Sequence, residues 1–182
     1  MRQLPTGGEN VKCFSELMRK RRSVRSFSDE PVSSEDVEAV LQAGRLAPSA
    51  SNRQPWHFIV IRDANRREKL AEICGGQEFV GEAPVIIVPV ATEPDRVMTC
   101  EIPAYAVDLS IAVTQMILEA AERDLGTCWI GYFNQDEAKE ILEVPQQYKV
   151  FTVLPLGHPA DEPKDKNRKA LEDIVSYETF GN

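Results

Sequence analysis

The strongest structural signal in the sequence is one apolar run, Val85-Ile86-Ile87-Val88-Pro89-Val90-Ala91. The run contains no polar side chain and starts with four β-branched residues, a pattern typical of a central strand buried on both faces. Pro89 lies inside the run and has no N–H to donate to a neighbouring strand. We therefore expect a buried strand at residues 85–91, with Pro89 at an edge contact or at the end of the strand.

Helical and extended patterns are mixed on either side of this strand. Further strands are predicted at residues 56–62, 127–133 (interrupted by Gly131) and 148–156. Helices are predicted at residues 10–21, from Ser33 or Ser34 to Leu46, from Asp63 to Gly75-Gly76, at 104–125, from the capping box of Asn134 and Glu137 to Glu143, and at 171–177. A mixture without strict alternation favours a sheet flanked by helices over a doubly wound βαβ fold.

The composition is that of one globular domain with an acidic surface. The chain has 182 residues, 42% of them apolar, and its 21 Lys and Arg oppose 29 Asp and Glu, for a formal net charge of −8. No repeat or long linker divides it, so we expect a single domain at residues 10–177, preceded by a tail at 1–9. The acidic balance argues against nucleic acid as a partner, because binding a polyanion requires a basic surface.

The spacing of the cysteines and the hydropathy of the chain indicate the cellular compartment of the protein. Cys13, Cys74, Cys100 and Cys128 lie far apart and form no Cys-x-x-Cys pair, which predicts free, mostly buried thiols in a reducing environment. Residues 2–10 are too polar for a signal peptide, and the long apolar helix at 104–125 carries too many charges for a membrane span. We therefore expect a cytoplasmic protein that does not associate with membranes.

Several common catalytic motifs are absent from the sequence. It has no Gly-x-Ser-x-Gly elbow, phosphate-binding Gly-x-x-x-x-Gly-Lys loop, Gly-x-Gly-x-x-Gly turn or His-Glu-x-x-His pair. The two histidines are His57, expected to be an ordinary packed or surface imidazole, and His158. Hydrolase and metal-dependent mechanisms therefore have little support, and no metal site is predicted.

Four segments could bind an anion or a flat ligand. The first, Arg21-Arg22-Ser23-Val24-Arg25-Ser26-Phe27, suits a phosphate, but it also suits a solvated basic surface or the end of a helix. The second, Ala-Pro-Ser-Ala-Ser-Asn-Arg-Gln-Pro-Trp at 47–56, is either a binding loop or a plain connection. The third segment, at 126–133, either offers a glycine amide to a ring of the ligand or is simply a buried strand. The fourth, the basic stretch at 164–169, is either part of a site or a solvated loop.

Taken in order, these segments resemble the FMN-dependent nitroreductase family. The most specific pieces are Arg-Arg-Ser-x-Arg-x-Phe at 21–27, Ala-Pro-Ser-x-x-Asn-x-Gln-Pro-Trp at 47–56 and Cys-Trp-Ile-Gly at 128–131. The resemblance extends from residue 21 to residue 177, nearly the whole chain. It implies an α+β fold, a three-layer α/β/α sandwich with a mostly antiparallel sheet, assembled as an intertwined homodimer with two FMN sites at the interface.

The resemblance also implies which residues hold the phosphate end of FMN. Arg21, Arg22 and Ser23 would bind the phosphate and the ribityl chain. Arg168, together with Lys166, would complete the phosphate clamp.

The residues implied around the flavin ring come from one arginine and two segments: Arg25; Ser49, Ala50, Ser51, Asn52 and Gln54; and Ile130 and Gly131. Arg25 would lie near the pyrimidine edge, where a fixed cation stabilises the negative charge of the reduced flavin. The loop at 49–51 would reach the flavin from the partner subunit, supported by Asn52 and Gln54. The Gly131 amide would address N5, the atom that carries the hydride.

The reaction implied by the resemblance is ping-pong hydride transfer. NADH or NADPH delivers hydride to flavin N5, and a small oxidised acceptor, such as a nitroaromatic or a quinone, is then reduced in a pocket shaped in part by residues 92–103. This chemistry needs no dedicated protein acid or base, in agreement with the missing catalytic histidine or carboxylate pair. Two alternatives stay open: a flavin-binding module or flavin reductase without a dedicated nitro substrate, and an anion-binding or nucleic-acid-binding domain centred on residues 19–25.

Overall fold

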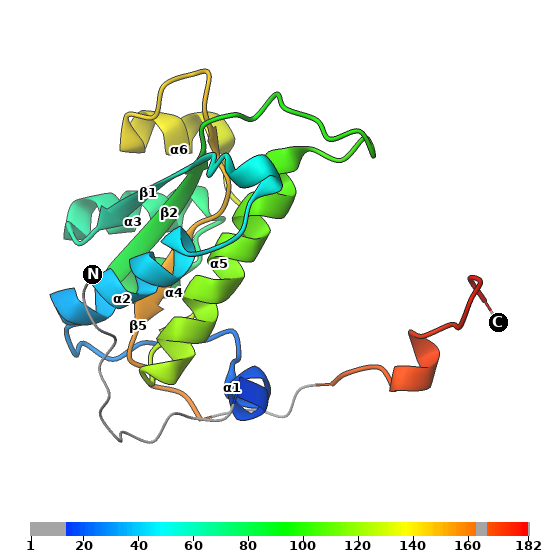
Figure 1. Cartoon of the computed structure of the whole chain (residues 1–182). Coiled ribbons are helices and arrows are strands. Elements are labelled where there is room, and N and C mark those ends of the chain that lie inside the picture. Colours follow the sequence, from blue (N-terminus) through cyan, green and yellow to red (C-terminus); the bar gives the residue numbers. More distant parts are fainter. Residues whose placement is uncertain (1–13, 163–166, 182) are drawn as a thin grey trace, which may run out of the picture.

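The computed structural model describes residues 14–162 and 167–181 and is built around a five-stranded sheet (Figure 1). The strand order is β1-β2-β5-β3, with β4 also paired to β2, and all these pairs are antiparallel. The strands are β1 (Trp56–Ile61), β2 (Val85–Ala91), β3 (Gly126–Thr127), β4 (Lys149–Val150) and β5 (Leu154–Gly157). The expected mostly antiparallel sheet is confirmed.

Strand β2 is the centre of the sheet, as its apolar run predicts. All seven of its residues are buried, and it pairs with β1 on one edge and with β4 and β5 on the other. The expectation that Pro89 marks an edge or an end is wrong, because Pro89 lies inside the strand. The missing N–H is tolerated because β5 pairs up to Ile87 and β4 from Val90, while the Pro89 carbonyl accepts the Phe151 N–H at 2.9 Å.

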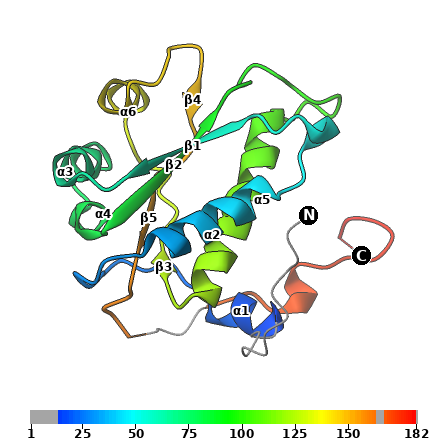
Figure 2. The same ribbon diagram turned by 60° about the vertical axis from the view of Figure 1, so that its left-hand side comes forward.

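Helices cover both faces of the sheet (Figure 2). Helices α2 and α5 lie on one face, and α3, α4 and α6 lie on the other. Alternate residues of β2 feed two separate cores: Ile86 and Val88 pack on the α3 side, and Val85 and Ile87 pack on the side of α2 and α5. The helices are α1 (Phe14–Lys20), α2 (Ser34–Arg45), α3 (Ala64–Ile73), α4 (Glu78–Glu82), α5 (Ala104–Glu122) and α6 (Gln135–Leu142). The chain is thus the expected three-layer α/β/α sandwich.

Three helices begin at the capping residues that the sequence predicts. The Ser33 hydroxyl accepts the Asp36 N–H at the start of α2, and the Asp63 carboxylate accepts the Arg66 N–H at the start of α3. Asn134 accepts two backbone N–H groups at the start of α6. Each side chain satisfies amides that the first helical turn leaves without a partner.

Several predicted element boundaries differ from the structure. The strand expected at 127–133 is reduced to β3 and an isolated bridge between Ile130 and Val153, and the strand expected at 148–156 is split into β4 and β5. The short helix α4 was not predicted, and the last predicted helix is only a 3₁₀ turn at Leu171–Asp173. The start of the first predicted helix, at residues 10–13, and the tail at 1–9 lie outside the described residues.

Helix α5 is a core helix with one outward face. Within the described residues it is the one helix long and apolar enough to cross a membrane, but half of that stretch is buried inside the fold. Leu109, Ala112, Val113 and Met116 are fully buried, and Met116 packs in the core that α5 shares with α2 and the sheet. The remaining apolar surface of α5 is only partly covered by the rest of the described chain.

A close approach between β3 and the segment after α1 depends on Gly126. A β-carbon at this position would lie 2.6 Å from a methyl group of the Val24 side chain, which is buried. We expect Gly126→Ala to lower the free energy of unfolding by about 1–3 kcal/mol, measured by urea unfolding. Gly131→Ala is the matched control, because a β-carbon there meets no atom within 4 Å. Equal stability of the two variants would contradict this close packing.

Candidate functional site

A groove lies where the end of α1 meets the C-terminal end of α5 and strand β3. It has a volume of about 710 Å³. Its walls combine cationic and apolar side chains, among them Arg21, Arg22, Arg168, Val24, Ile117 and Leu125. We call it the cationic groove. This combination suits a ligand with an anionic group on an apolar body.

Backbone pairing brings the first and third predicted segments together beside this groove. The Val24 N–H donates to the Thr127 carbonyl at 2.9 Å, and Ser23 forms a parallel bridge with Thr127. On its other side the same segment binds the chain after β5, where the Ala160 N–H donates to the Ser26 carbonyl at 3.0 Å. Residues 23–26 are therefore held between two other segments.

Arg22 is committed to a partner within the chain. One guanidinium nitrogen donates to both carboxylate oxygens of Asp161 at 2.9 Å, and another donates to the Asp161 carbonyl at 2.6 Å. The Arg22 side chain is only 15% exposed. A phosphate role for Arg22, as the resemblance implies, would require this ion pair to be shared or broken.

Of the two residues that the resemblance adds to the phosphate clamp, Arg168 is described by the structure, whereas Lys166 lies outside the described residues. Arg168 is exposed and lines the cationic groove with Arg21. The groove also contains Asp124, whose carboxylate contacts Lys20. Asp161 and Asp124 thus each bind a cation of the same region, which reduces their repulsion of an anionic ligand.

Ser23 and Arg25 lie close to Cys128. Burial raises the pKa of the Cys128 thiol, and the positive charge of Arg25 and hydrogen bonding with Ser23 oppose this shift. Burial alone raises the pKa of Cys74 to about 12. Both thiols are buried, as expected, but Cys100 is exposed, and Cys13 lies outside the described residues.

The segment at 128–131 turns two residues outward. Ile130 is buried and exchanges backbone hydrogen bonds with Val153 at 3.0 and 3.1 Å. Trp129 and Gly131, on either side of Ile130, are exposed, and the Trp129 ring meets Phe151 edge to face at 5.4 Å. The Gly131 backbone is therefore open to a ligand, because no atom lies within 4 Å of the position a β-carbon would take.

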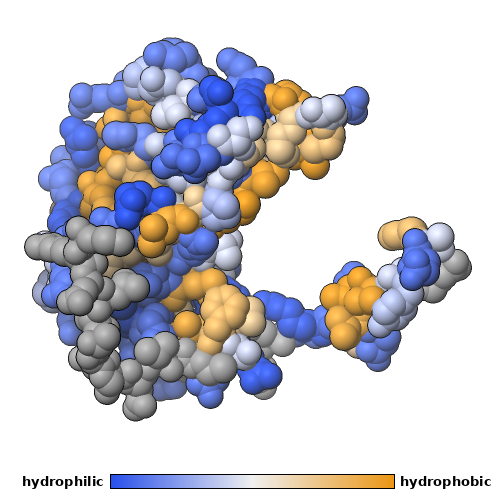
Figure 3. Space-filling model, viewed as in Figure 1, coloured by the Kyte–Doolittle hydropathy of each residue, from blue (hydrophilic) through white to orange (hydrophobic). Residues whose placement is uncertain are grey.

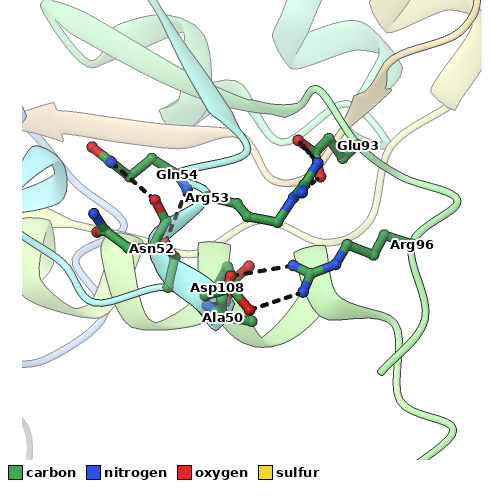
Figure 4. Close-up of polar contacts among 9 residues, drawn as sticks. Ala50, Asn52, Arg53, Gln54, Glu93, Arg96 and Asp108 are labelled. Atoms are coloured by element: carbon green, nitrogen blue, oxygen red, sulfur yellow. Dashed lines mark hydrogen bonds and ion pairs between the residues drawn. The ribbon is translucent and has the colours of Figure 1, made fainter. Parts of the chain in front are cut away.

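The second predicted segment is a braced loop (Figure 4). The Ala50 N–H donates to Asp108 Oδ1 on α5 at 2.8 Å, and Arg96 donates to the Ala50 carbonyl at 3.2 Å. Within the loop, the Gln54 N–H donates to the Ser49 hydroxyl at 2.9 Å. Arg53 donates to both carboxylate oxygens of Glu93 at 2.7 and 2.9 Å, and this hydrogen bonding is the largest cause of the lowered pKa of Glu93.

The backbone of this loop is strained. Ser51, Asn52 and Gln54 have φ values of 58°, 54° and 55°, in the left-handed region that favours glycine. Such a conformation costs about 1–2 kcal/mol for a residue with a β-carbon. Strain of this kind persists only where surrounding contacts enforce it, and here Asp108 and Arg96 are those contacts.

One chain does not bring all the predicted site residues together. The loop at 49–54 is attached near the start of α5, at Asp108, whereas the cationic groove contacts α5 at Ile117 and Ala121. At a rise of about 1.5 Å per residue, Asp108 and Ala121 are about 20 Å apart along the helix. Figure 1 shows the loop and α1 at opposite ends of α5.

Sequence reasoning missed the residues that hold the site in shape. Asp108 counted only against a membrane span, although a lone carboxylate on the buried side of an apolar helix is a recognisable sign of a specific partner. Arg96, Glu93 and Asp161 lie in irregular segments without a periodic pattern. Their partners are 40 or more positions away in the sequence, so no local signal identifies them.

Neither a metal site nor a catalytic histidine is found in the part of the chain that the structure describes. No group of three His, Cys, Asp or Glu side chains within residues 14–162 and 167–181 could hold a metal ion. His57 is exposed on β1, and His158 Nε2 lies 3.9 Å from the Glu30 carboxylate.

Comparison with known proteins decides the family. The sequence profile described as the nitroreductase family matches residues 18–77 and 74–158. The chain belongs to the nitroreductase family. The nitroreductase fold is also seen in a solved structure of a hypothetical oxidoreductase from Bacillus subtilis, with 30% identity, a TM-score of 0.85, and coverage of 93% of this chain and 75% of the other.

Two further proteins that are similar to this chain carry names that refer to FMN. The FMN reductase (NAD(P)H) of Bacillus subtilis is 33% identical over 178 residues, which cover 88% of this chain and 72% of the relative. A solved FMN-dependent nitroreductase from Clostridium difficile is 30% identical with a TM-score of 0.80, covering 90% of this chain and 98% of the other.

Proposed function

We propose that this chain is an FMN-dependent oxidoreductase that uses NADH or NADPH to reduce a small oxidised acceptor, such as a nitroaromatic or a quinone, in two alternating half-reactions. Family membership and the named relatives support an NAD(P)H oxidoreductase that uses FMN. The observation that carries the proposal is the cationic groove, where Arg21 and Arg168 line one cavity beside strand β3.

The residues of the groove fit the chemistry of FMN. Its phosphate is a dianion, and guanidinium groups bind phosphate oxygens with charge-assisted hydrogen bonds. Val24, Ile117 and Leu125 give the same groove an apolar wall. Cations at one end and apolar surface beside them match a cofactor that joins a phosphate to a flat ring system.

Each of these residues has a proposed role in binding the cofactor. Arg21 and Arg168 bind the phosphate, and Ser23 adds a hydroxyl donor. Arg25 provides a fixed cation for negative charge on the reduced ring. When bound, FMN would supply the redox chemistry, as a carrier of hydride through its N5 atom from NAD(P)H to the acceptor. The Gly131 amide orients the ring at this atom, and its open surroundings leave room for a flat ligand.

The site is completed by a second copy of the chain. Within one chain the loop at 49–54 and the cationic groove lie at opposite ends of α5. If two chains associate by two-fold symmetry with their α5 helices side by side, the loop of one subunit comes to the groove of the other. Such an isologous interface uses the same surface on both subunits.

Two apolar surfaces, one partly exposed and one fully exposed, support this homodimer. One is the outward face of α5, and Figure 3 shows apolar surface along the hollow between the 92–103 loop and α1. The other is the arm at residues 167–181, all of them exposed, which extends away from the body of the subunit (Figure 1). Exposed apolar surface of this extent marks an interface. The arm's large apolar residues are Leu171, Ile174, Val175, Tyr177 and Phe180.

The purified protein is expected to bind FMN, and the flavin absorbance should bleach when NADH or NADPH is added without oxygen. An acceptor screen then identifies which oxidised compound restores the absorbance. Bound FMN that neither nucleotide reduces would favour a binding module without turnover. A protein that takes up no FMN but binds nucleic acid with a steep salt dependence would favour the alternative of a nucleic-acid-binding domain centred on residues 19–25.

The phosphate clamp is tested by Arg21→Ala and Arg168→Ala. Each variant removes a guanidinium from the cationic groove, and we expect the FMN dissociation constant to rise about 10-fold or more in each. Arg66→Ala is the matched control, because Arg66 pairs with Glu143 at a site between α3 and α6. Fluorescence titration of the apoprotein gives the affinities, and unchanged affinity in both groove variants would overturn the clamp.

The arm is tested by a chain that ends at residue 170. Because the apolar residues at 171–180 are exposed in one subunit, their removal is expected to weaken the dimer and shift it towards monomer in sedimentation velocity. A full-length Leu171→Asp, Ile174→Asp variant, which keeps the length of the arm, should act in the same direction. A dimer of unchanged affinity in both proteins would show that the arm does not bind the second subunit.

A further inference from the structure

Two side chains from separate elements fix the peptide groups of Ala50. Asp108, on α5, is only 1% exposed, and its Oδ1 accepts the Ala50 N–H at 2.8 Å. Arg96, from the loop after β2, donates to the Ala50 carbonyl at 3.2 Å and reaches the Ser51 hydroxyl at 3.5 Å. Figure 4 shows both side chains directed at this point of the loop.

The second oxygen of Asp108 argues against a simple packing role. Its Oδ2 is buried, and no hydrogen-bond partner for it is found in the described part of the chain. A buried carboxylate oxygen without a partner destabilises a fold, so a small apolar residue would serve packing better. The hydrogen bond that Asp108 does form in the described part of the chain is the one from the Ala50 N–H.

The contacts act where the backbone is least favourable. Ser51 and Asn52 follow the fixed residue directly, and both have left-handed φ values. Without Asp108 and Arg96 the loop would relax towards the ordinary right-handed or extended conformations. The two side chains thus add to the hydrogen bond between the Gln54 N–H and the Ser49 hydroxyl, and together these contacts favour one shape of the loop.

We propose that Asp108 and Arg96 are positioning residues, which hold the loop at 49–54 in the shape that meets the flavin of the second subunit. This inference rests on the proposed function, because the loop needs a cofactor to act on. The side chains do not touch the cofactor themselves. They act through the Ala50 peptide groups. Because the loop is already ordered before the cofactor binds, binding costs less conformational entropy.

The brace itself is tested on the apoprotein by hydrogen exchange. The Ala50 amide should exchange slowly in the wild type and at least about 10-fold faster in Asp108→Ala, because its acceptor is gone. Asp108→Asn keeps an acceptor oxygen in the same place and should restore most of the protection. Arg96→Ala should also speed exchange without unfolding the protein, since Arg96 lies outside the core clusters.

The role in positioning is tested by FMN affinity in the dimer. We expect the dissociation constant to rise about 10-fold in Asp108→Ala and in Arg96→Ala, and to stay within about 3-fold of the wild type in Asp108→Asn and in the control Arg66→Ala. Sedimentation velocity and thermal unfolding on the same samples show whether each variant remains a folded dimer. Should Asp108→Ala fail to fold, Arg96→Ala and Asp108→Asn still decide the result.

The outcomes separate the two proposals. Faster Ala50 exchange together with weaker FMN binding in folded variants supports the positioning role. Wild-type FMN affinity in folded Arg96→Ala, or equal loss in Asp108→Asn and Asp108→Ala, overturns it while leaving the proposed function intact. A wild-type protein that binds no FMN overturns the proposed function, and the positioning role with it.

Discussion

Burial of β2 on both faces is the constraint on which the rest of the structure depends. A strand with no solvent-exposed face requires a layer of helices on each side, and the alternate residues of β2 supply one core to each layer. Helix α5 is fixed against one face in this way. Its two ends then place the cationic groove and the braced loop, so the geometry of the candidate site follows from the packing of one strand.

The sequence predicts the elements of this fold better than their connections. Ser33, Asp63 and Asn134 start the expected helices because capping depends on residues only a few positions away. Pro89 was misjudged because its tolerance depends on two separate strands that share one edge of β2, a non-local arrangement. The strands expected at 127–133 and 148–156 were predicted too long for a similar reason, since Ile130 and Val153 form only an isolated bridge between these two segments.

The candidate site also contains residues that local sequence signals predict and residues that depend on non-local contacts. The segments that contain Arg21, Arg25 and Gly131 carry local motifs, and the sequence identifies them. The groups that shape these segments come from distant parts of the chain: Asp161 binds Arg22 from 139 positions away, and Asp108 binds Ala50 from 58 positions away. No composition or periodicity links such pairs. A resemblance to a family supplies the first kind of residue, whereas only three-dimensional coordinates reveal the second.

Helix α5 acts as a spacer between the two halves of the candidate site. In the proposed dimer, the loop near its first turns and the groove near its last turns belong to different sites, so the length of the helix sets the separation of the two flavins. One residue more or fewer would rotate one end about 100° relative to the other and shift it by about 1.5 Å. The number of residues in α5 is therefore constrained by the proposed assembly as well as by the packing of its buried face within one chain.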